Sequence, residues 1–156
     1  MIRQAGDKDF DKIMRLWQET NSTAHGFIDA GYWQKNADFV RYSCLPAAQT
    51  FVFVDRHQIK GFISLLEGSY IGACFVDNRF QNRKIGSKLI RYLQKRRNLL
   101  KLHVYTLNDK AVVFYRRQGF KVIGESIQEE TGQSELLMCW SLGCPPSRFV
   151  RQKEDS

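Results

Sequence analysis

Two short segments in the second half of the chain carry the residue types best suited to chemistry. The first, residues 75–87, reads FVDNRFQNRKIGS and runs from an apolar stretch through a polar, basic loop into the start of a predicted helix. A helix N-terminus presents unpaired N–H groups and a partial positive charge, and this combination binds phosphate. Gly86 would let an anion approach the backbone, Ser87 would add a hydroxyl, and Arg83 and Lys84 would add charge. The residues alone support a phosphate site and a basic loop that merely caps a helix about equally.

The second segment, residues 108–120, reads NDKAVVFYRRQGF. Ala111, Phe114 and Tyr115 fall on one face of a predicted helix by their i, i+3 and i+4 spacing. Gly119 is placed to end that helix. A tyrosine on such a face is usually part of the core with its hydroxyl paired. Taken alone, this segment therefore favours packing over catalysis.

Hydrophobic periodicity predicts the elements that must position these segments. In the first half, a strand over Met1–Ala5 precedes an amphipathic helix that Asp7 caps and that runs to about Glu19. A polar loop over residues 21–26 leads to a less regular helical stretch from about Tyr32 to Tyr42. Three strands of an antiparallel meander follow, at residues 51–54, 59–66 and 70–76.

After residue 76 the pattern changes to alternating helices and strands. Helices are predicted at about residues 85–93 and 109–118, and strands at residues 103–106, 120–123 and 136–140. An antiparallel meander followed by β/α alternation predicts a mixed α/β fold in which one sheet carries helices on both faces.

Together the two segments resemble motifs of the GNAT (Gcn5-related N-acetyltransferase) superfamily. Residues 81–86, QNRKIG, resemble its pyrophosphate-binding motif, and residues 108–120 resemble its Asn-x-x-Ala-x-x-Phe-Tyr-x-x-x-Gly-Phe motif. The order of the predicted elements agrees with the family from Met1 to about Leu142, and residues 25–28, HGFI, resemble a His-x-Phe-Ile signature of a bacterial subgroup. The resemblance implies a central mixed, largely antiparallel sheet of about seven strands, flanked by about four helices and splayed between the fourth and fifth strands.

The resemblance also implies a reaction and a cosubstrate. Family members transfer acetyl directly from acetyl-CoA to a primary amine, which here could be a protein lysine, a protein N-terminus or a small-molecule amine, without a metal. Phe75 and Val76 occupy the strand that pairs with the pantetheine arm in the family. The full set of cofactor-binding residues implied is Phe75, Val76, Gln81, Asn82, Arg83, Lys84, Ile85, Gly86, Ser87, Asn108 and Tyr115.

One position departs from the family pattern. Lys84 stands where the family usually has the first glycine of the loop, which it uses for close approach of the backbone to the pyrophosphate. We expect the lysine stem to swing outward and its ammonium group to supplement phosphate binding. The departure also keeps open a competing function, a non-catalytic acyl-CoA sensor of the same fold, which the intact Asn108 and Tyr115 argue against.

The resemblance supports the candidate catalytic residues to different degrees. Tyr115 matches the general acid for the CoA thiolate, and a phenol of ordinary pKa about 10 stays protonated where a thiol of about 8.5 ionises. Glu67, just before Gly68, is a candidate base acting through water, and a solvated turn glutamate is the competing interpretation. His25, Phe27 and Trp33 are candidates for the acceptor site. The competing interpretations are a surface or capping histidine and core aromatics.

Length and composition fit one domain over residues 1–156, with a flexible tail expected from about residue 145. The chain has no apolar run of the roughly 20 residues that a membrane helix needs and no signal-peptide pattern, so we expect a cytoplasmic protein with no membrane partner. Four cysteines without C-x-x-C spacing predict no metal site. A monomer and a homodimer both remain open.

The formal charge of +8 could attract nucleic acid, anionic lipid or an anionic small ligand. No signature of a nucleic-acid-binding motif is present, so we expect no nucleic-acid partner. Long-range steering by a positive enzyme favours an acceptor whose overall field is neutral or acidic, or a large partner.

Overall fold

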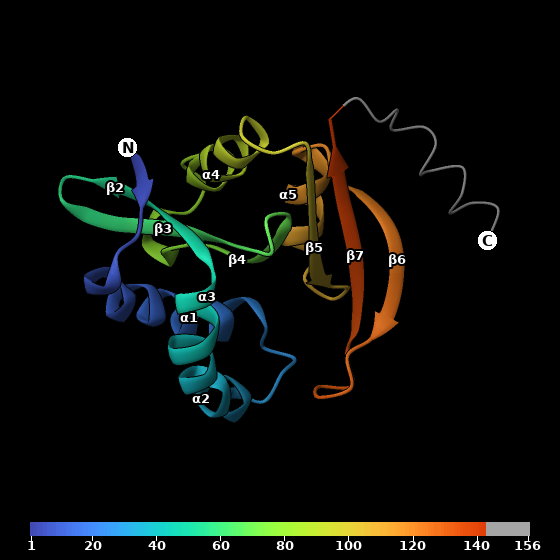
Figure 1. Cartoon of the computed structure of the whole chain (residues 1–156). Helices are drawn as coiled ribbons and strands as arrows, with labels where there is room; N and C mark the ends of the chain where they lie inside the picture. The colour runs from blue at the N-terminus through green and yellow to red at the C-terminus, as the bar shows by residue number, and fades with distance from the viewer. Residues whose placement is uncertain (143–156) are drawn as a thin grey trace.

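A seven-stranded sheet runs through the centre of the molecule (Figure 1), and the computed structural model describes residues 1–142. The predicted tail from about residue 145 lies outside these residues. The strands lie side by side in the order β1-β2-β3-β4-β5-β7-β6, and every neighbouring pair is antiparallel except β4 and β5. Their bounds are β1 Ile2–Gln4, β2 Gln49–Asp55, β3 Gln58–Leu66, β4 Tyr70–Val76, β5 Leu99–Tyr105, β6 Lys121–Ile127 and β7 Ser134–Ser141.

Helices cover both faces of the sheet (Figure 1). Helices α1 (Phe10–Ala24) and α2 (Ala30–Phe39) lie on one face with the three-residue α3 (Leu45–Ala47), and α4 (Ile85–Gln94) and α5 (Asp109–Arg117) lie on the other. The predicted mixed fold, with about seven strands and four main helices, is confirmed.

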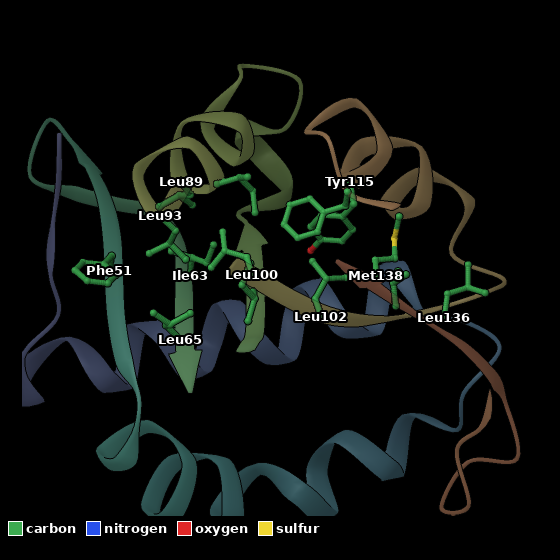
Figure 2. Close-up of a cluster of buried hydrophobic side chains, with 14 of the residues drawn as sticks. Phe51, Ile63, Leu65, Leu89, Leu93, Leu100, Leu102, Tyr115, Leu136 and Met138 are labelled. Carbon is green, nitrogen blue, oxygen red and sulfur yellow. The ribbon is translucent and has the colours of Figure 1, made fainter. Parts of the chain in front are cut away.

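Each face has its own hydrophobic core. Under α4 and α5, side chains such as Leu89, Leu93, Leu100 and Leu102 are almost completely buried, and Figure 2 shows Tyr115 pointing from α5 towards this cluster. Under α1 and α2, Ile13, Leu16 and Trp17 pack on Val52 and Phe62. Alternating residues of a strand enter opposite cores because the side-chain period of a strand is two.

The sheet opens between β4 and β5. Among the described residues, the two strands share one paired position, between Tyr70, the first residue of β4, and Lys101, the third residue of β5. Beyond this point they diverge, so the later residues of β4, including Phe75 and Val76, pair with β3 only. The expected splay between the fourth and fifth strands is confirmed, and it leaves unpaired backbone groups along the edge of β4.

An extra residue bends β4 where the opening begins. Leu65 pairs with Ile71 and Ser64 with Ala73, so Gly72 stands opposite no partner in β3 and forms a β-bulge. A Cβ at Gly72 would come within 2.9 Å of Leu66 Cδ1, so a larger residue there would displace the end of the Leu66 side chain.

The first helix differs from its predicted bounds. It continues past Glu19 to Ala24 because two polar residues expected to end it bond back to the helix: Thr20 Oγ1 donates to the Leu16 carbonyl at 2.5 Å, and Asn21 Nδ2 donates to the Trp17 carbonyl at 2.8 Å. Asp7 does not cap the helix.

The capping carboxylate belongs to Asp9 instead. It accepts the Gly6 N–H at 2.9 Å and pairs with Arg3 at 2.8 Å. The second helix also differs, because it begins behind Asp29 at Ala30 and widens into a π turn over Val40–Cys44.

Candidate active site

The opening in the sheet is occupied by a cleft of about 1080 Å³. Its walls come from the end of α1, the start of α2, strands β4 and β5, the loop before α4, and the first turns of α4 and α5. Residues from both faces of the sheet line it, so the cleft passes from one helical layer to the other. The two ends differ in chemistry, and each is built by different elements.

The end on the α4 side is suited to phosphate. The N–H groups in the first turn of α4, from Ile85 to Ser87, point out of the helix without intrahelical partners. Lys84 caps this helix in the left-handed conformation, with φ of 64°, and is exposed. This conformation explains why the family usually has glycine at this position, because a residue with a side chain is strained in the left-handed conformation.

Gly86 has a second role in this turn. A Cβ there would lie 3.1 Å from Phe114 Cζ, so glycine lets α4 and α5 pack closely beside the cleft. Ser87 Oγ accepts a hydrogen bond from Gln118 Nε2 at 3.0 Å, and Gln94 Nε2 donates to the Gln118 carbonyl at 2.8 Å. These contacts fix both ends of α4 against the C-terminal end of α5.

The loop before α4 is anchored by an ion pair between a buried aspartate and an exposed arginine. Asp77 is buried, accepts the Arg79 N–H at 2.9 Å and binds the Arg79 guanidinium at 2.9 Å. These hydrogen bonds hold the pKa of Asp77 below its usual value. Arg83 packs over the Phe80 ring at 5.7 Å and does not line the cleft.

Tyr115 reaches the cleft from α5 with its side chain 9% exposed. Its hydroxyl is hydrogen-bonded to the Cys74 thiol of β4. Burial raises the pKa of Tyr115 well above its ordinary value, and it raises the pKa of Cys74 to about 12. Both groups are therefore protonated at neutral pH.

A chain of hydrogen bonds joins α1 to the start of α5. His25, the C-cap residue of α1, lies 3.0 Å by Nδ1 from Asn21 Oδ1 and 3.1 Å by Nε2 from Asn108 Nδ2. Asn108 Oδ1 in turn accepts the Ala111 N–H at 3.3 Å and caps α5. The chain crosses the cleft and ties together elements far apart in sequence.

The partners of His25 determine its tautomer. Asn21 uses its amide N–H towards Trp17, so its oxygen accepts the His25 Nδ1–H, and Nε2 is left to accept from Asn108. Burial lowers the pKa of His25 to about 4. The imidazole is thus neutral, with both nitrogens engaged. The sequence does not reveal this bridge because Asn108 lies 83 residues away from His25.

The end on the α1 and α2 side is aromatic and acidic. Its lining residues on this side are Tyr32, Trp33, Tyr70, His103, Tyr105, Gln128 and Glu135. Tyr32 Oη donates to Glu130 Oε2 at 3.0 Å, which links α2 to the β6–β7 loop. Apart from Trp33, none of these residues was predicted as a site residue, because their strands come together only in the folded sheet.

The structure places most of the expected site residues on one cleft. Glu67 is exposed in the β3–β4 turn and does not line the cleft, and neither do Arg83 and Phe27. Phe27 instead makes T-shaped contacts with the rings of His25 and Tyr105. The expected residues that do line it are Phe75, Val76, Gln81, Asn82, Lys84, Ile85, Gly86, Ser87, Asn108, Tyr115, His25 and Trp33.

The described residues contain no cluster of three or more His, Cys, Asp or Glu side chains able to hold a metal ion. Within residues 1–142, no helix is both long and apolar enough to cross a membrane.

The fold and the cleft agree with a known family. Residues 18–142 match the model of the acetyltransferase (GNAT) domain. The chain therefore belongs to the GNAT acetyltransferase family. It is an acetyl-CoA-dependent N-acetyltransferase.

Individual relatives cover nearly the whole chain. Peptidyl-lysine N-acetyltransferase YiaC of Escherichia coli K12 is 36% identical over 140 residues, which cover 90% of this chain and 96% of YiaC. The solution structure of apo-form YjaB from Escherichia coli has a TM-score of 0.78 at 27% identity, covering 92% of this chain and 98% of that one. PaiA N-acetyltransferase from Thermoplasma acidophilum, solved in complex with coenzyme A, has a TM-score of 0.73 at 16% identity, covering 90% of this chain and 98% of that one, and shows the shared fold.

Proposed function

We propose that this enzyme acetylates the ε-amine of lysine residues in proteins. The observation that carries the proposal is the chemical contrast between the two ends of the cleft. The α4 end offers helix N–H groups and Lys84 to the anionic cofactor, and the opposite end offers aromatic rings and the Glu135 carboxylate. A lysine ammonium group is attracted by both aromatic faces and carboxylates.

The charge distribution fits a protein acceptor. The whole chain is positive, which steers acidic or neutral partners towards it, and the acceptor end is locally negative through Glu130 and Glu135. A protein can satisfy both conditions, because its overall field is separate from the one lysine it presents. The two Escherichia coli relatives YiaC and YjaB, 36% and 32% identical, are named peptidyl-lysine N-acetyltransferases.

In the proposed reaction, the lysine nitrogen attacks the thioester carbon directly and no acyl-enzyme forms. The edge of β4 at Phe75 and Val76 holds the pantetheine arm, and a backbone N–H of this edge polarises the acetyl oxygen. Tyr115 protonates the departing CoA thiolate.

The proposal is tested by incubating the protein with acetyl-CoA and lysine-containing peptides, with acetylation sites mapped by mass spectrometry. N-terminally blocked and unblocked peptides, and small amines, separate the three acceptor classes. We expect ε-acetyl-lysine as the main product. Acetylation confined to peptide N-termini or to small amines would contradict the proposed acceptor.

The acceptor end is tested by removing its charge. Glu135→Gln should raise KM for a lysine peptide several-fold with little change in kcat, because the charge attracts the ammonium group without taking part in the transfer. Glu129→Gln, in the same segment but outside the cleft lining, is the matched control. An unchanged KM in Glu135→Gln would show that the carboxylate does not face the acceptor.

A further inference from the structure

A hydrogen-bonded pair of side chains bridges the two diverging strands at the acceptor end of the cleft. Tyr70 is the first residue of β4, and its hydroxyl lies 2.7 Å from Nδ1 of His103 in β5. Both residues line the cleft. Two groups that exchange protons readily are thus joined where the sheet begins to open.

The geometry points to Tyr70 and His103 as the relay that removes the proton from the acceptor amine. This inference rests on the acetyltransferase activity and adds the group that the sequence did not identify. Tyr70 Oη lies within hydrogen-bond distance of His103 Nδ1, and the phenol donates to the imidazole in the tautomer whose Nδ1 carries no proton. A lone pair of the oxygen is available to the cleft.

The position of the pair suits a direct transfer. Along β5, Leu100, Leu102 and Val104 enter the core under α4 and α5, so His103 and Tyr105 project on the opposite, acceptor face. Tyr115 approaches from the α5 face. The proton donor for the thiolate and the relay for the amine therefore lie on opposite sides of the opening. Direct transfer requires this arrangement, because the amine attacks the acetyl carbon from one side and the thiolate leaves from the other.

Each proton and bond in the step is accounted for. The amine nitrogen bonds to the acetyl carbon, the carbon–sulfur bond breaks, and the thiolate takes the Tyr115 proton. The nitrogen loses a proton to the Tyr70 oxygen while the Tyr70 proton passes to His103 Nδ1. The exposed imidazolium then releases its Nε2 proton to solvent, and Tyr115 regains a proton from solvent.

Other candidate bases are less well placed. Both nitrogens of His25 are engaged with Asn21 and Asn108. Glu67 does not line the cleft.

The ionisable groups around the relay are few. Lys101 and Tyr105 share its face of β5, Tyr70 comes from β4, and Glu135 comes from β7 opposite Tyr105. Burial and, to a lesser extent, the negative charge of Glu135 raise the pKa of Tyr70, which keeps the phenol protonated.

The test compares wild type with Tyr70→Phe, His103→Asn and the double variant, on any amine that the wild type acetylates. Asn keeps an acceptor oxygen near the position of Nδ1 but cannot take a proton. We expect each single variant to lower kcat/KM by about 10²-fold, the usual size of general base catalysis. The double variant should be no slower than either single variant, because the two groups act as one unit.

The pH profile separates a relay from a structural contact. In the wild type, log kcat/KM should fall with a slope of about two in acid, one for the amine and one for the imidazole. Both single variants should fall with a slope of about one. His57→Asn, an exposed histidine in the β2–β3 turn outside the cleft, is the matched control and should behave as wild type.

Wild-type rates, additive losses or a retained second ionisation in Tyr70→Phe would overturn the relay. Acetyl-CoA affinity, measured by calorimetry, checks that each variant is folded, and Tyr70→Phe decides alone if His103→Asn does not fold. Failure of lysine peptides as acceptors would count against the proposed acceptor only, because the relay is tested on any amine.

Discussion

Tyr115 is the residue where packing and chemistry coincide. Its ring belongs to the core under α4 and α5, and its hydroxyl meets Cys74 at the cleft. The sequence pattern of Ala111, Phe114 and Tyr115 favoured packing, and the family motif favoured catalysis. The structure is compatible with both, because a ring buried at the base of the sheet opening can fill the core and still present its oxygen to the cofactor.

Tyr115→Phe should lower kcat about 10²-fold while leaving the affinity for acetyl-CoA nearly unchanged, because it removes a proton donor and no binding group. Release of free CoA thiol measures kcat, and calorimetry measures the affinity. Tyr42→Phe, an exposed tyrosine outside the cleft, serves as the control. Full activity of Tyr115→Phe would rule out the role.

His25 makes stability depend on pH. Its pKa is about 4 in the folded protein and about 6.5 when unfolded, so between these values only the unfolded state binds the proton. The free energy of unfolding therefore falls as the pH is lowered through this window, by about 2 kcal/mol at pH 5 from His25 alone.

His25→Gln should lose part of this dependence. The variant is expected to be less stable at pH 7.5 by about 1–3 kcal/mol, because buried partners lose a hydrogen bond, but its further loss between pH 7.5 and pH 5 should be smaller than in wild type. Urea denaturation at the two pH values measures both. Equal losses in the two proteins would contradict a buried neutral histidine.

At the scale of elements, the turn that starts α4 carries most of the features that we expect to bind the cofactor. Lys84 places a side chain where the left-handed backbone favours glycine, at a cost of about 1 kcal/mol. Lys84→Gly should raise the free energy of unfolding slightly, by about 0.5 kcal/mol, since the added freedom of the unfolded chain offsets part of the gain. Lys84→Gln should give no such gain, because it keeps the Cβ.

Both Lys84 variants should bind acetyl-CoA about 2–5-fold more weakly and with less dependence on salt, because each removes one charge near the phosphates. Calorimetry at two salt concentrations measures this. If Lys84→Gly bound much more tightly and Lys84→Gln did not, the side chain would be an obstruction, and the expected outward swing of the lysine stem would be wrong.

At the scale of the whole molecule, the sheet consists of two parts, β1–β4 and β5–β7, joined at Tyr70 and Lys101 and by side-chain bridges such as His25 to Asn108. Acetyl-CoA bound in the opening would contact both parts. The cofactor should therefore stabilise the protein as a unit and protect the backbone amides that face the opening.

At 100 times the dissociation constant, acetyl-CoA should add about 2.7 kcal/mol to the free energy of unfolding, which corresponds to a Tm increase of about 5–10 °C. Thermal unfolding measures the increase, and hydrogen exchange should show new protection at Phe75 and Val76. Protection confined to the surface of α5, with no change at this edge of β4, would place the cofactor outside the opening.

The sequence by itself determined the order of the elements and the mixed fold, and it predicted which residues form the α4 end of the cleft. These depend on local information: hydrophobic periodicity, the glycine that ends α5 (Gly119 has φ of 97°), and two motifs that are contiguous in the chain. The end of α1 was missed because Thr20 and Asn21, polar residues typical of loops, bond back to the helix when they are buried.

Only the tertiary structure decided the acceptor half. Tyr70, His103 and Glu135 come from three strands with no shared motif, and they meet because β4 and β5 pair at one position and then diverge. The bridging position of His25 likewise depends on Asn108, 83 residues away, which no local pattern encodes. Contacts between distant segments follow from how the sheet and its two helical layers pack, so they become visible only when the chain is folded.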